Sequence, residues 1–448
     1  MNDKQTAKLK DWAQIWLEEQ RRLQQIPGIS YCVFTPGKIL VKGSLGYADL
    51  TYLKRIDPDH TLFRIASISK SITALAIAKL VAEGRLGLDD PVTKYLEIPE
   101  LRDIKIKHLL AHTSGIRRDL DIPFWLSDVF PDHDDLFKEM LKGDVCIFKP
   151  DKKYKYSNLA YAILGLVIAV VSSSDYEQYI KAEILAPLGL SHIYPDSSSL
   201  SPKELKNLAV GYSANLIDAK LNVTRSAFKV IDTLSFAPAV GYVATATDLA
   251  VLISEWSLKS EKLVPNKIKQ LFLKPRKVEA HPEDVYALGL KVVKSGKNVL
   301  YEHGGSFAGY RSYYAFSPKH AVGVIVMTNS MNEAPKKLAE SLINMQIKIK
   351  NLQKIDDRFK HYEGIYANRW GDYHIISLGS RLYYYDLKSE DPAKEIIEIA
   401  GNVNVGFVDS NAPGNSYKGE KIAFDFTAKG GIKQVRFGSS ILYPKFWN

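Results

Sequence analysis

The chain has 448 residues, of which 46% are hydrophobic and 25% charged, and its formal net charge is +10. A chain of this size and composition can bury a full hydrophobic core in two or three domains, which excludes an intrinsically disordered protein. The basic excess describes the surface and not the fold. Because no nucleic-acid-binding motif accompanies it, we do not expect nucleic acid as a partner.

The first residues and the longest apolar run indicate where in the cell the protein is expected to be. Charged residues interrupt the apolar stretch that a signal peptide would need. They are Asp3, Lys4, Lys8, Lys10 and Asp11. The longest apolar run, 159–171, contains Tyr161 and is shorter than the roughly 20 residues that span a bilayer. We therefore expect a cytoplasmic protein with no membrane partner, and a core helix at 159–171.

Cysteines and acidic clusters give no sign of a metal. Cys32 and Cys146 are too few for a disulfide framework in a chain of this length, so buried reduced thiols are expected. The stretch Asp132-His133-Asp134-Asp135 lacks the ligand spacing of a metal site and is interpreted as a solvated loop. We expect no metal and no cofactor.

In chain order, the predicted elements begin with an amphipathic helix over residues 6–25. Two strands follow, joined by the turn Pro36-Gly37-Lys38, and three more strands lie far along the chain. The five predicted strands cover residues 30–35, 39–47, 300–303, 310–316 and 321–327. Because they bracket a mostly helical middle, we expect an α+β fold: an antiparallel five-stranded sheet flanked by helices, with an inserted helical lobe.

The tail changes character after a helix predicted around residues 336–348. Residues 351–360 are charged and irregular, and short segments with a two-residue period follow. These segments are 373–378, 382–387, 396–400, 422–427 and 433–437. They predict a small antiparallel β-barrel of about eight strands. The expected domains are therefore 1–350, a linker at 351–360, and a barrel at 361–448.

The tetrapeptide Ser67-Ile68-Ser69-Lys70 begins a strongly apolar helix. Because three residues are almost one helical turn, the Lys70 amine can lie beside the Ser67 hydroxyl, and the helix N-terminus places partial positive charge where an oxyanion forms. Serine is a weak nucleophile unless a neighbour accepts its proton, and a lysine can do so if burial lowers its pKa. The pattern recurs at Ser226 and Lys229, but no long buried helix follows there, so Ser67 is the predicted nucleophile.

Tyr156-Ser157-Asn158 directly precedes the apolar run 159–171. A phenol at this position can carry the proton between Ser67 and a leaving group, and the Asn158 amide can bind a substrate carbonyl and Lys70 together. A second copy of Tyr-x-Asn, beginning at Tyr366, lies in the tail and is interpreted as structural.

His303-Gly304-Gly305-Ser306 follows a predicted strand. Two glycines allow a ligand to lie directly against the strand backbone. The N–H of Ser306 is then available to a substrate carbonyl, and with the N–H of Ser67 it would form an oxyanion hole, where one donor typically lowers the barrier by roughly 3 kcal/mol.

These motifs resemble the β-lactamase-related family that contains class C β-lactamases, D-aminopeptidases, esterases and D,D-peptidases. The resemblance spans residues 8–345 and includes three further stretches, 83–91, 108–115 and 186–190. It implies a β-lactamase/transpeptidase-like fold and an acyl-enzyme mechanism. The roles it implies are Ser67 as nucleophile, Lys70 and Tyr156 as general acid/base, Asn158, His303, Gly304 and Gly305 as substrate contacts, and the N–H groups of Ser67 and Ser306 as the oxyanion hole. His112 resembles a structural position that braces the loop.

Two features narrow the range of activities and assemblies that the resemblance implies. Penicillin-binding members usually carry lysine where this chain has His303, and that cation holds the carboxylate of β-lactams, so β-lactamase and D,D-carboxypeptidase activities are disfavoured. The tail resembles the lipocalin-like barrel appended to some archaeal members. The whole layout is similar to archaeal self-compartmentalising serine peptidases, which implies a closed homo-oligomer.

The leading hypothesis is therefore a serine peptidase that takes peptide substrates and tolerates D-amino acids. An esterase acting on small acyl esters is the alternative within the same class, because His303 then needs no charge. A binding module that kept the fold without catalysis is the alternative from a different class, and the presence of Ser67, Lys70 and Tyr156 argues against it.

Overall fold

The computed structural model describes residues 1–217, 223–278, 281–295, 298–332, 335–395, 397–402, 405–408 and 419–445. The chain forms two compact units, one of Ile26–Ala339 and the other of Met1–Gln25 with Glu340–Asn448. This division differs from the domains expected at 1–350 and 361–448, because the first helix and most of the last long helix group with the tail.

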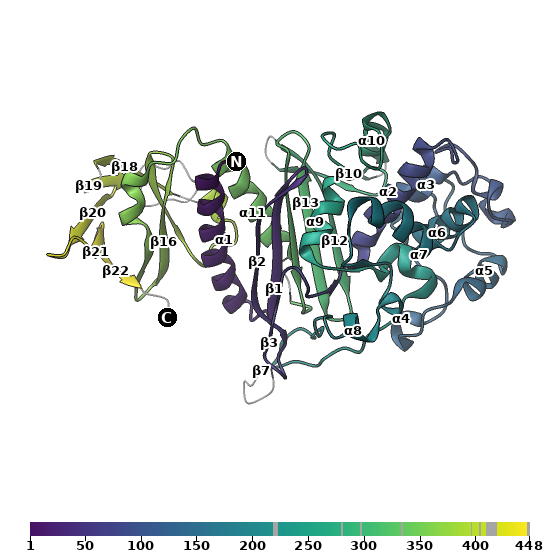
Figure 1. Cartoon of the computed structure of the whole chain (residues 1–448), viewed down its shortest axis with the longest axis horizontal. Helices are drawn as coiled ribbons and strands as arrows, with labels where there is room; N and C mark the ends of the chain where they lie inside the picture. The colour runs from purple at the N-terminus through teal and green to yellow at the C-terminus, as the bar shows by residue number, and fades with distance from the viewer. Residues whose placement is uncertain are drawn as a thin grey trace. The chain divides into compact units, whose positions relative to one another are not determined.

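The larger unit is built on a nine-stranded antiparallel sheet in the order β3-β2-β1-β14-β13-β12-β11-β10-β9 (Figure 1). The five predicted strands form its contiguous centre. They are β1 (Gly28–Thr35), β2 (Lys38–Asp49), β12 (Asn298–Phe307), β13 (Tyr310–Ser317) and β14 (Val322–Thr328).

The predicted strand count of five was wrong because short strands extend both edges of the sheet. They are β3 (Lys54–Arg55) on one side, and β11 (Lys291–Ser295), β10 (His281–Tyr286) and β9 (Arg276–Val278) on the other. β3 and β9, with two and three residues, are too short for a two-residue period to be recognised, and β10 and β11 were not predicted. The fold class itself, α+β with a helical lobe inserted into an antiparallel sheet, is confirmed.

Two apolar helices fill the middle of the larger unit. In α2 (Ser69–Ala82) nearly every residue is buried, which explains why the sequence shows no polar stripe. In α6 (Asn158–Ser172) the run begins at Ser157, whose side chain accepts a hydrogen bond from the Ala160 N–H at 2.9 Å. Figure 1 shows α2 and α6 on the same side of the sheet.

Shorter helices complete the larger unit. They are α3 (Ile106–Leu110), α4 (Phe124–Ser127), α5 (His133–Leu141), α7 (Tyr176–Tyr179), α8 (Pro202–Leu205), α9 (Ala246–Ser254) and α10 (Asn266–Leu273). The stretch interpreted as a solvated loop is in fact the start of α5, because the Asp132 carboxylate accepts a hydrogen bond from the Asp135 N–H at 2.8 Å and caps the helix. Among the described residues, no single helix passes the length and hydropathy test for a membrane span; α6 passes only as a pair with 176–188, bent by 74°.

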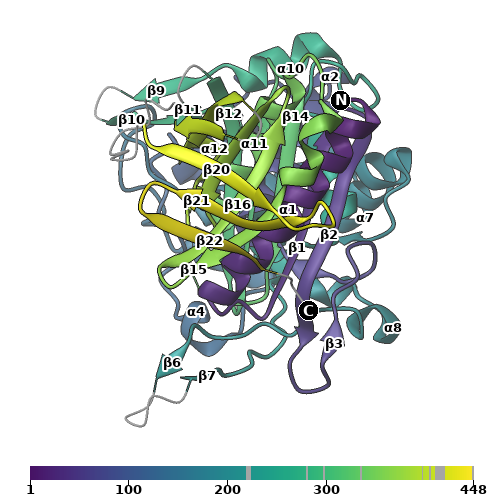
Figure 2. The same ribbon diagram turned by 90° about the vertical axis from the view of Figure 1, so that its left-hand side faces the viewer.

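The tail forms a closed antiparallel barrel, in which each strand pairs with the next and the last pairs with the first (Figure 2). Its strands are β15 (Gly364–Asn368), β16 (Gly371–Leu378), β17 (Arg381–Asp386), β18 (Ile397–Asn402), β19 (Val405–Val408), β20 (Lys421–Phe426), β21 (Ile432–Phe437) and β22 (Ser440–Lys445). The predicted small barrel of about eight strands is confirmed, although β15, β19 and β22 were not predicted.

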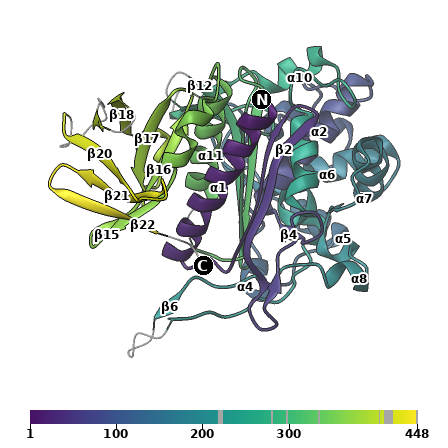
Figure 3. The same cartoon turned by 60° about the vertical axis from the view of Figure 1, so that its left-hand side comes forward.

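The N-terminal helix α1 (Asp3–Leu23) belongs to the barrel unit. It runs beside α11 (Pro335–Lys350), and the Gln5 side-chain amide donates to the carbonyl of Ile349 at 3.2 Å (Figures 1 and 3). The Trp16 indole N–H donates to the carbonyl of Ser389 at 3.0 Å. The two ends of the chain therefore build one unit.

Candidate active site

Ser67 lies in a single helical turn, η1 (Ala66–Ile68), that leads directly into α2. The side chains on either side of Ser67 are buried, whereas Ser67 itself is partly exposed. Ala66, the residue before it, has a φ of 47°, a left-handed conformation that is rare for a residue with a side chain. Such backbone strain clusters at functional sites, and here it falls directly before Ser67.

Lys70 is completely buried and points its amine at Ser67. The Nζ atom lies 3.4 Å from Ser67 Oγ, and it donates hydrogen bonds to Asn158 Oδ1 and to the carbonyl of Ala239, both at 2.8 Å. Burial holds the pKa of Lys70 well below its usual range, and the charge of Arg118 adds to this effect while that of Asp119 opposes it. A neutral amine with two fixed donor bonds keeps its lone pair free for the Ser67 proton.

Tyr156 lies beside the same Lys70 amine. Lys70 Nζ is 4.8 Å from the centroid of the Tyr156 ring. Burial raises the pKa of the phenol, and its hydrogen bond with Ser67 works in the opposite direction. Tyr156 is therefore a phenol that can give a proton to a leaving group next to Ser67.

Asn158 connects Lys70 to a residue that the motifs did not predict. Its Nδ2 atom donates a hydrogen bond to Asp119 Oδ1 at 2.9 Å, and Asp119 forms an ion pair with Arg118, Nε to Oδ2, at 3.2 Å. The carbonyl of Arg118 in turn accepts hydrogen bonds from the backbone N–H groups of Asn158 and Leu159. A continuous polar chain thus runs from the buried Lys70 to the exposed guanidinium of Arg118.

His303 is buried and already engaged within the protein. Its Nε2 atom lies 2.9 Å from the Tyr286 hydroxyl and its Nδ1 atom 2.8 Å from the carbonyl of Gly304. Burial, and secondarily the charge of Lys70, lower the pKa of His303 to about 3. The imidazole is therefore neutral at physiological pH and cannot supply the cation that a lysine would supply here.

His112 braces the loop that carries Tyr156. Its Nδ1 atom accepts a hydrogen bond from the Ser157 N–H at 3.1 Å, and its ring packs 4.4 Å from that of Tyr156 and 4.8 Å from that of Tyr286. Burial holds the pKa of His112 well below its usual range. The geometry agrees with the bracing role that the resemblance implies.

Gly305 brings strand β12 against the turn that carries Ser67. A Cβ atom at position 305 would lie 2.1 Å from the carbonyl oxygen of Ile65, so only glycine allows this approach. The Ser312 hydroxyl on β13 donates to the same carbonyl at 2.9 Å. The exposed Ser306 follows Gly305, which places its backbone beside the start of the Ser67 helix.

One edge of β12 is open next to this turn. Its pairing with β11 ends at Lys291 and Glu302, and among the described strands only β13 pairs with residues 303–307. Backbone donors and acceptors along such an edge can pair with an extended peptide. The site therefore combines a serine hydroxyl, a neutral amine, a phenol and a free strand edge.

Residues 16–344 match the family described as Beta-lactamase. The chain belongs to the Beta-lactamase family. Curated relatives of this family member include protein flp of Staphylococcus aureus: that of strain MRSA252 is 28% identical over 360 residues, which are 78% of this chain and 68% of that protein. The form from strain N315 is 30% identical over 344 residues, 74% of this chain and 65% of that protein. The family member thus spans about two thirds of these relatives.

Solved structures share the fold over nearly the whole chain. The octameric penicillin-binding protein homologue from Pyrococcus abyssi superposes with a TM-score of 0.64 at 23% identity, covering 96% of this Beta-lactamase family member and 99% of that chain. SurE gives a TM-score of 0.64 at 20% identity, and SurE with D-Leu a TM-score of 0.61 at 20% identity; each covers 98% of this chain and 99% of that chain. At these identities the likeness establishes the fold.

The second copies of the motifs lie outside the site. Ser226 is exposed in an irregular segment, and Tyr366 lies on strand β15 of the barrel. The sequence missed Asp119, Arg118 and Tyr286, as well as the Ala239 carbonyl. Arg118 and Asp119 come shortly after the stretch 108–115, and this proximity was the one signal in the sequence that could have indicated them. Tyr286 and Ala239 lie in segments without a motif. Among the described residues no cluster of His, Cys, Asp or Glu has the arrangement of a metal site.

Proposed function

We propose that this protein is a serine peptidase that hydrolyses peptides through an acyl-enzyme on Ser67. The observation that carries the proposal is the 3.4 Å approach of the buried Lys70 amine to Ser67 Oγ, beside the Tyr156 phenol. A hydroxyl paired with a neutral amine is an activated nucleophile. Lys70 and Tyr156 have no comparable use in a binding module.

In the acylation step, Ser67 Oγ attacks the substrate carbonyl as its proton moves to the Lys70–Tyr156 pair. The N–H groups of Ser67 and Ser306 receive the oxyanion of the tetrahedral intermediate. The C–N bond then breaks, and the same pair returns the proton to the departing amine. The Asn158 amide binds a carbonyl on the acyl side of the substrate and at the same time holds Lys70.

In the deacylation step, water attacks the ester on Ser67. The Lys70–Tyr156 pair takes a proton from the water, and the ester bond to Oγ breaks with return of that proton to Ser67. The acid product leaves and the starting enzyme is regenerated. The open edge of β12 at 303–307 supports an extended peptide as substrate, because it offers the backbone pairing that a small ester cannot use.

Tolerance of D-amino acids and assembly into a homo-oligomer are part of the proposal. One structural neighbour is SurE with D-Leu, and another is an octameric penicillin-binding protein homologue. Both cover nearly the whole chain, barrel included, which supports carrying these properties over as proposals. A closed oligomer would restrict the site to short or unfolded peptides, and a cytoplasmic location stays a prediction.

An esterase is the second candidate, and the neutral His303 favours it. With a pKa of about 3, His303 offers no charge to hold a substrate carboxylate. An uncharged acyl ester needs no such charge. The same Ser67, Lys70 and Tyr156 would perform this reaction with an alcohol as leaving group.

The test is mass spectrometry of products from a mixed library of L- and D-containing peptides and of small acyl esters. The wild type is compared with Ser67→Ala and with Ser226→Ala, which makes the same change in the exposed second copy of the motif. We expect peptide cleavage in the wild type and in Ser226→Ala, and none in Ser67→Ala. Cleavage of esters alone would select the esterase, and a folded protein that turns over neither, and that no fluorophosphonate labels, would favour a binding module.

A further inference from the structure

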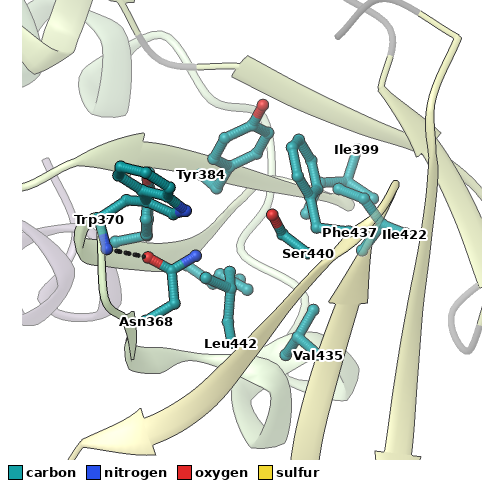
Figure 4. Close-up of a pocket in the computed structure, with 11 residues that line it drawn as sticks. Asn368, Trp370, Tyr384, Ile399, Ile422, Val435, Phe437, Ser440 and Leu442 are labelled. Carbon is teal, nitrogen blue, oxygen red and sulfur yellow. Dashed lines mark hydrogen bonds between the residues drawn. The ribbon is translucent and has the colours of Figure 1, made fainter.

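The barrel of the tail encloses a cavity of about 220 Å³ that plays no part in the proposed reaction (Figure 4). Its wall comes from seven strands, β15 to β18 and β20 to β22, and from Trp370 in the turn after β15. The lining residues are Asn368, Trp370, Tyr373, Ile375, Tyr384, Ile399, Ile422, Val435, Phe437, Ser440 and Leu442.

The wall is apolar because the two-residue period of the strands turns one face inward. Ile422, Val435 and Leu442 are buried in this face, and the rings of Tyr384 and Phe437 meet edge to face with centroids 5.0 Å apart. Trp370 is 67% exposed, which places an aromatic ring at the cavity and in contact with solvent. Most of this wall offers water no hydrogen-bond partner.

Two polar groups break this apolar wall and lie near each other. Asn368 Oδ1 accepts hydrogen bonds from the N–H groups of Trp370 and Gly371, at 2.8 and 3.2 Å, which fixes the amide so that Nδ2 is left over. Figure 4 shows that this nitrogen and the Ser440 hydroxyl both face the space between the labelled side chains. Among the described residues neither Nδ2 of Asn368 nor Oγ of Ser440 has a hydrogen-bond partner.

From this arrangement we propose that the barrel cavity binds a small neutral amphiphile, with an apolar body and a single carbonyl or hydroxyl head. The head would accept hydrogen bonds from Asn368 Nδ2 and Ser440 Oγ while the body lies against Ile422, Val435 and Leu442. A few polar groups converging in an apolar pocket are the usual form of a ligand site.

The size and charge of the cavity define the ligand further. Since an apolar cavity of about 150 Å³ holds benzene, 220 Å³ has room for roughly nine non-hydrogen atoms. None of the lining residues is charged. A carboxylate would therefore be buried without a compensating charge, which favours a neutral head. The proposal does not depend on the proposed peptidase activity.

The experiment is isothermal titration of the full chain with 2-octanone, which has nine non-hydrogen atoms and a carbonyl, and with octanoate as the charged counterpart. We expect saturable one-site binding of 2-octanone, and binding of octanoate at pH 7 at least tenfold weaker. Ser440→Trp fills the cavity and should abolish binding of the ketone. Ser439→Trp makes the same change at an exposed neighbour and should leave binding unchanged.

Two further measurements keep the test decisive. Ser440→Ala removes one hydrogen-bond donor without adding volume, and should weaken binding of 2-octanone several-fold. This variant replaces Ser440→Trp in the test if circular dichroism shows that Ser440→Trp does not fold. Absence of saturable binding to the folded wild type, or equal binding by Ser440→Trp and Ser439→Trp, would overturn the proposal. Equal binding of ketone and octanoate would overturn the neutral head.

Discussion

The side-chain amide of Asn158 donates a hydrogen bond to the carboxylate of Asp119 at 2.9 Å. An asparagine amide has one donor end and one acceptor end, so this bond determines that the acceptor end faces Lys70, where it receives a hydrogen bond at 2.8 Å. Asp119 thus orients Asn158, and through Asn158 it positions the amine that lies beside Ser67.

We predict that Asp119→Ala lowers kcat about ten- to hundredfold, because a freely rotating Asn158 amide no longer holds Lys70 in place. Asp119→Asn keeps an acceptor oxygen for the Asn158 amide and should retain most of the activity. Steady-state kinetics on one cleaved peptide would compare the two variants. Equal activity of Asp119→Ala and wild type would contradict the positioning role.

The pH dependence should shift in opposite directions when the two neighbouring charges are removed. The proposed mechanism requires neutral Lys70, so activity should be lost as pH falls through the lowered pKa of Lys70. The charge of Asp119 raises that pKa and the charge of Arg118 lowers it. Asp119→Asn should therefore move the acidic limb of kcat/KM to lower pH, and Arg118→Gln should move it to higher pH. Shifts of the same sign would show that Lys70 does not control this limb.

Gly305→Ala should disable the site more than Gly304→Ala. The new Cβ atom at position 305 would lie 2.1 Å from the Ile65 carbonyl, whereas at position 304 the nearest atom is in the Tyr313 ring, 3.1 Å away. Overpacking such as the clash at position 305 typically costs about 1–3 kcal/mol of stability, and here it should displace the turn before Ser67. Urea unfolding and the rate of fluorophosphonate labelling would measure both effects. Similar results for the two variants would contradict the close approach of β12.

Acid should destabilise both units through one buried histidine in each. Burial lowers the pKa of His303 and of His374 to about 3. An unfolded histidine has a pKa near ~6.5, so between these values the unfolded chain binds more protons and the free energy of unfolding falls as pH falls. The loss should approach ~1.4 kcal/mol per pH unit for each histidine.

Hydrogen exchange at pH 7 and pH 4.5 would assign this acid sensitivity to its units. His303→Gln should reduce it in the strands of the central sheet, and His374→Gln should reduce it in the barrel strands. The two variants act as controls for each other. An unchanged acid response in both would mean that other groups govern it.

Loss of the Trp16 side chain should destabilise the barrel unit. Trp16 is fully buried and its N–H bonds to the Ser389 carbonyl. Trp16→Ala should cost about 3–5 kcal/mol of the stability of this unit and speed hydrogen exchange in the barrel strands more than in β1 and β14. Leu23→Ala on the same helix, where the side chain is 47% exposed, should change little. Faster exchange confined to β1 and β14 would contradict the assignment of α1.

The long elements and the motif residues could be predicted because their signals are local. The helices at 69–82 and 158–172 are continuous apolar runs, and each of the five central strands is an apolar run within one segment. The spacing of Ser67 and Lys70 is likewise a property of one helical turn. These predictions needed no knowledge of how distant segments meet.

What the sequence did not reveal depends on distant partners. Lys70 and the Ala239 carbonyl are 169 residues apart, and no pattern around Ala239 marks it. His303 suggested a substrate contact, but only the structure pairs its ring with Tyr286. The edge strands β3, β10 and β9 form because β2, β11 and β10 respectively offer them a template, and their own residues carry little preference.

The grouping of residues 1–25 with 340–448 has a consequence for synthesis of the chain. A ribosome makes α1 before residues 26–339, yet Ser389, whose carbonyl accepts the hydrogen bond from Trp16, is made hundreds of residues later. The whole segment Ile26–Ala339 can emerge and fold as one piece in between, since domains fold as units during synthesis. Until the strands of the barrel unit are made, the apolar face of α1 would have no partner. In the nascent chain this helix would therefore be a binding site for a chaperone.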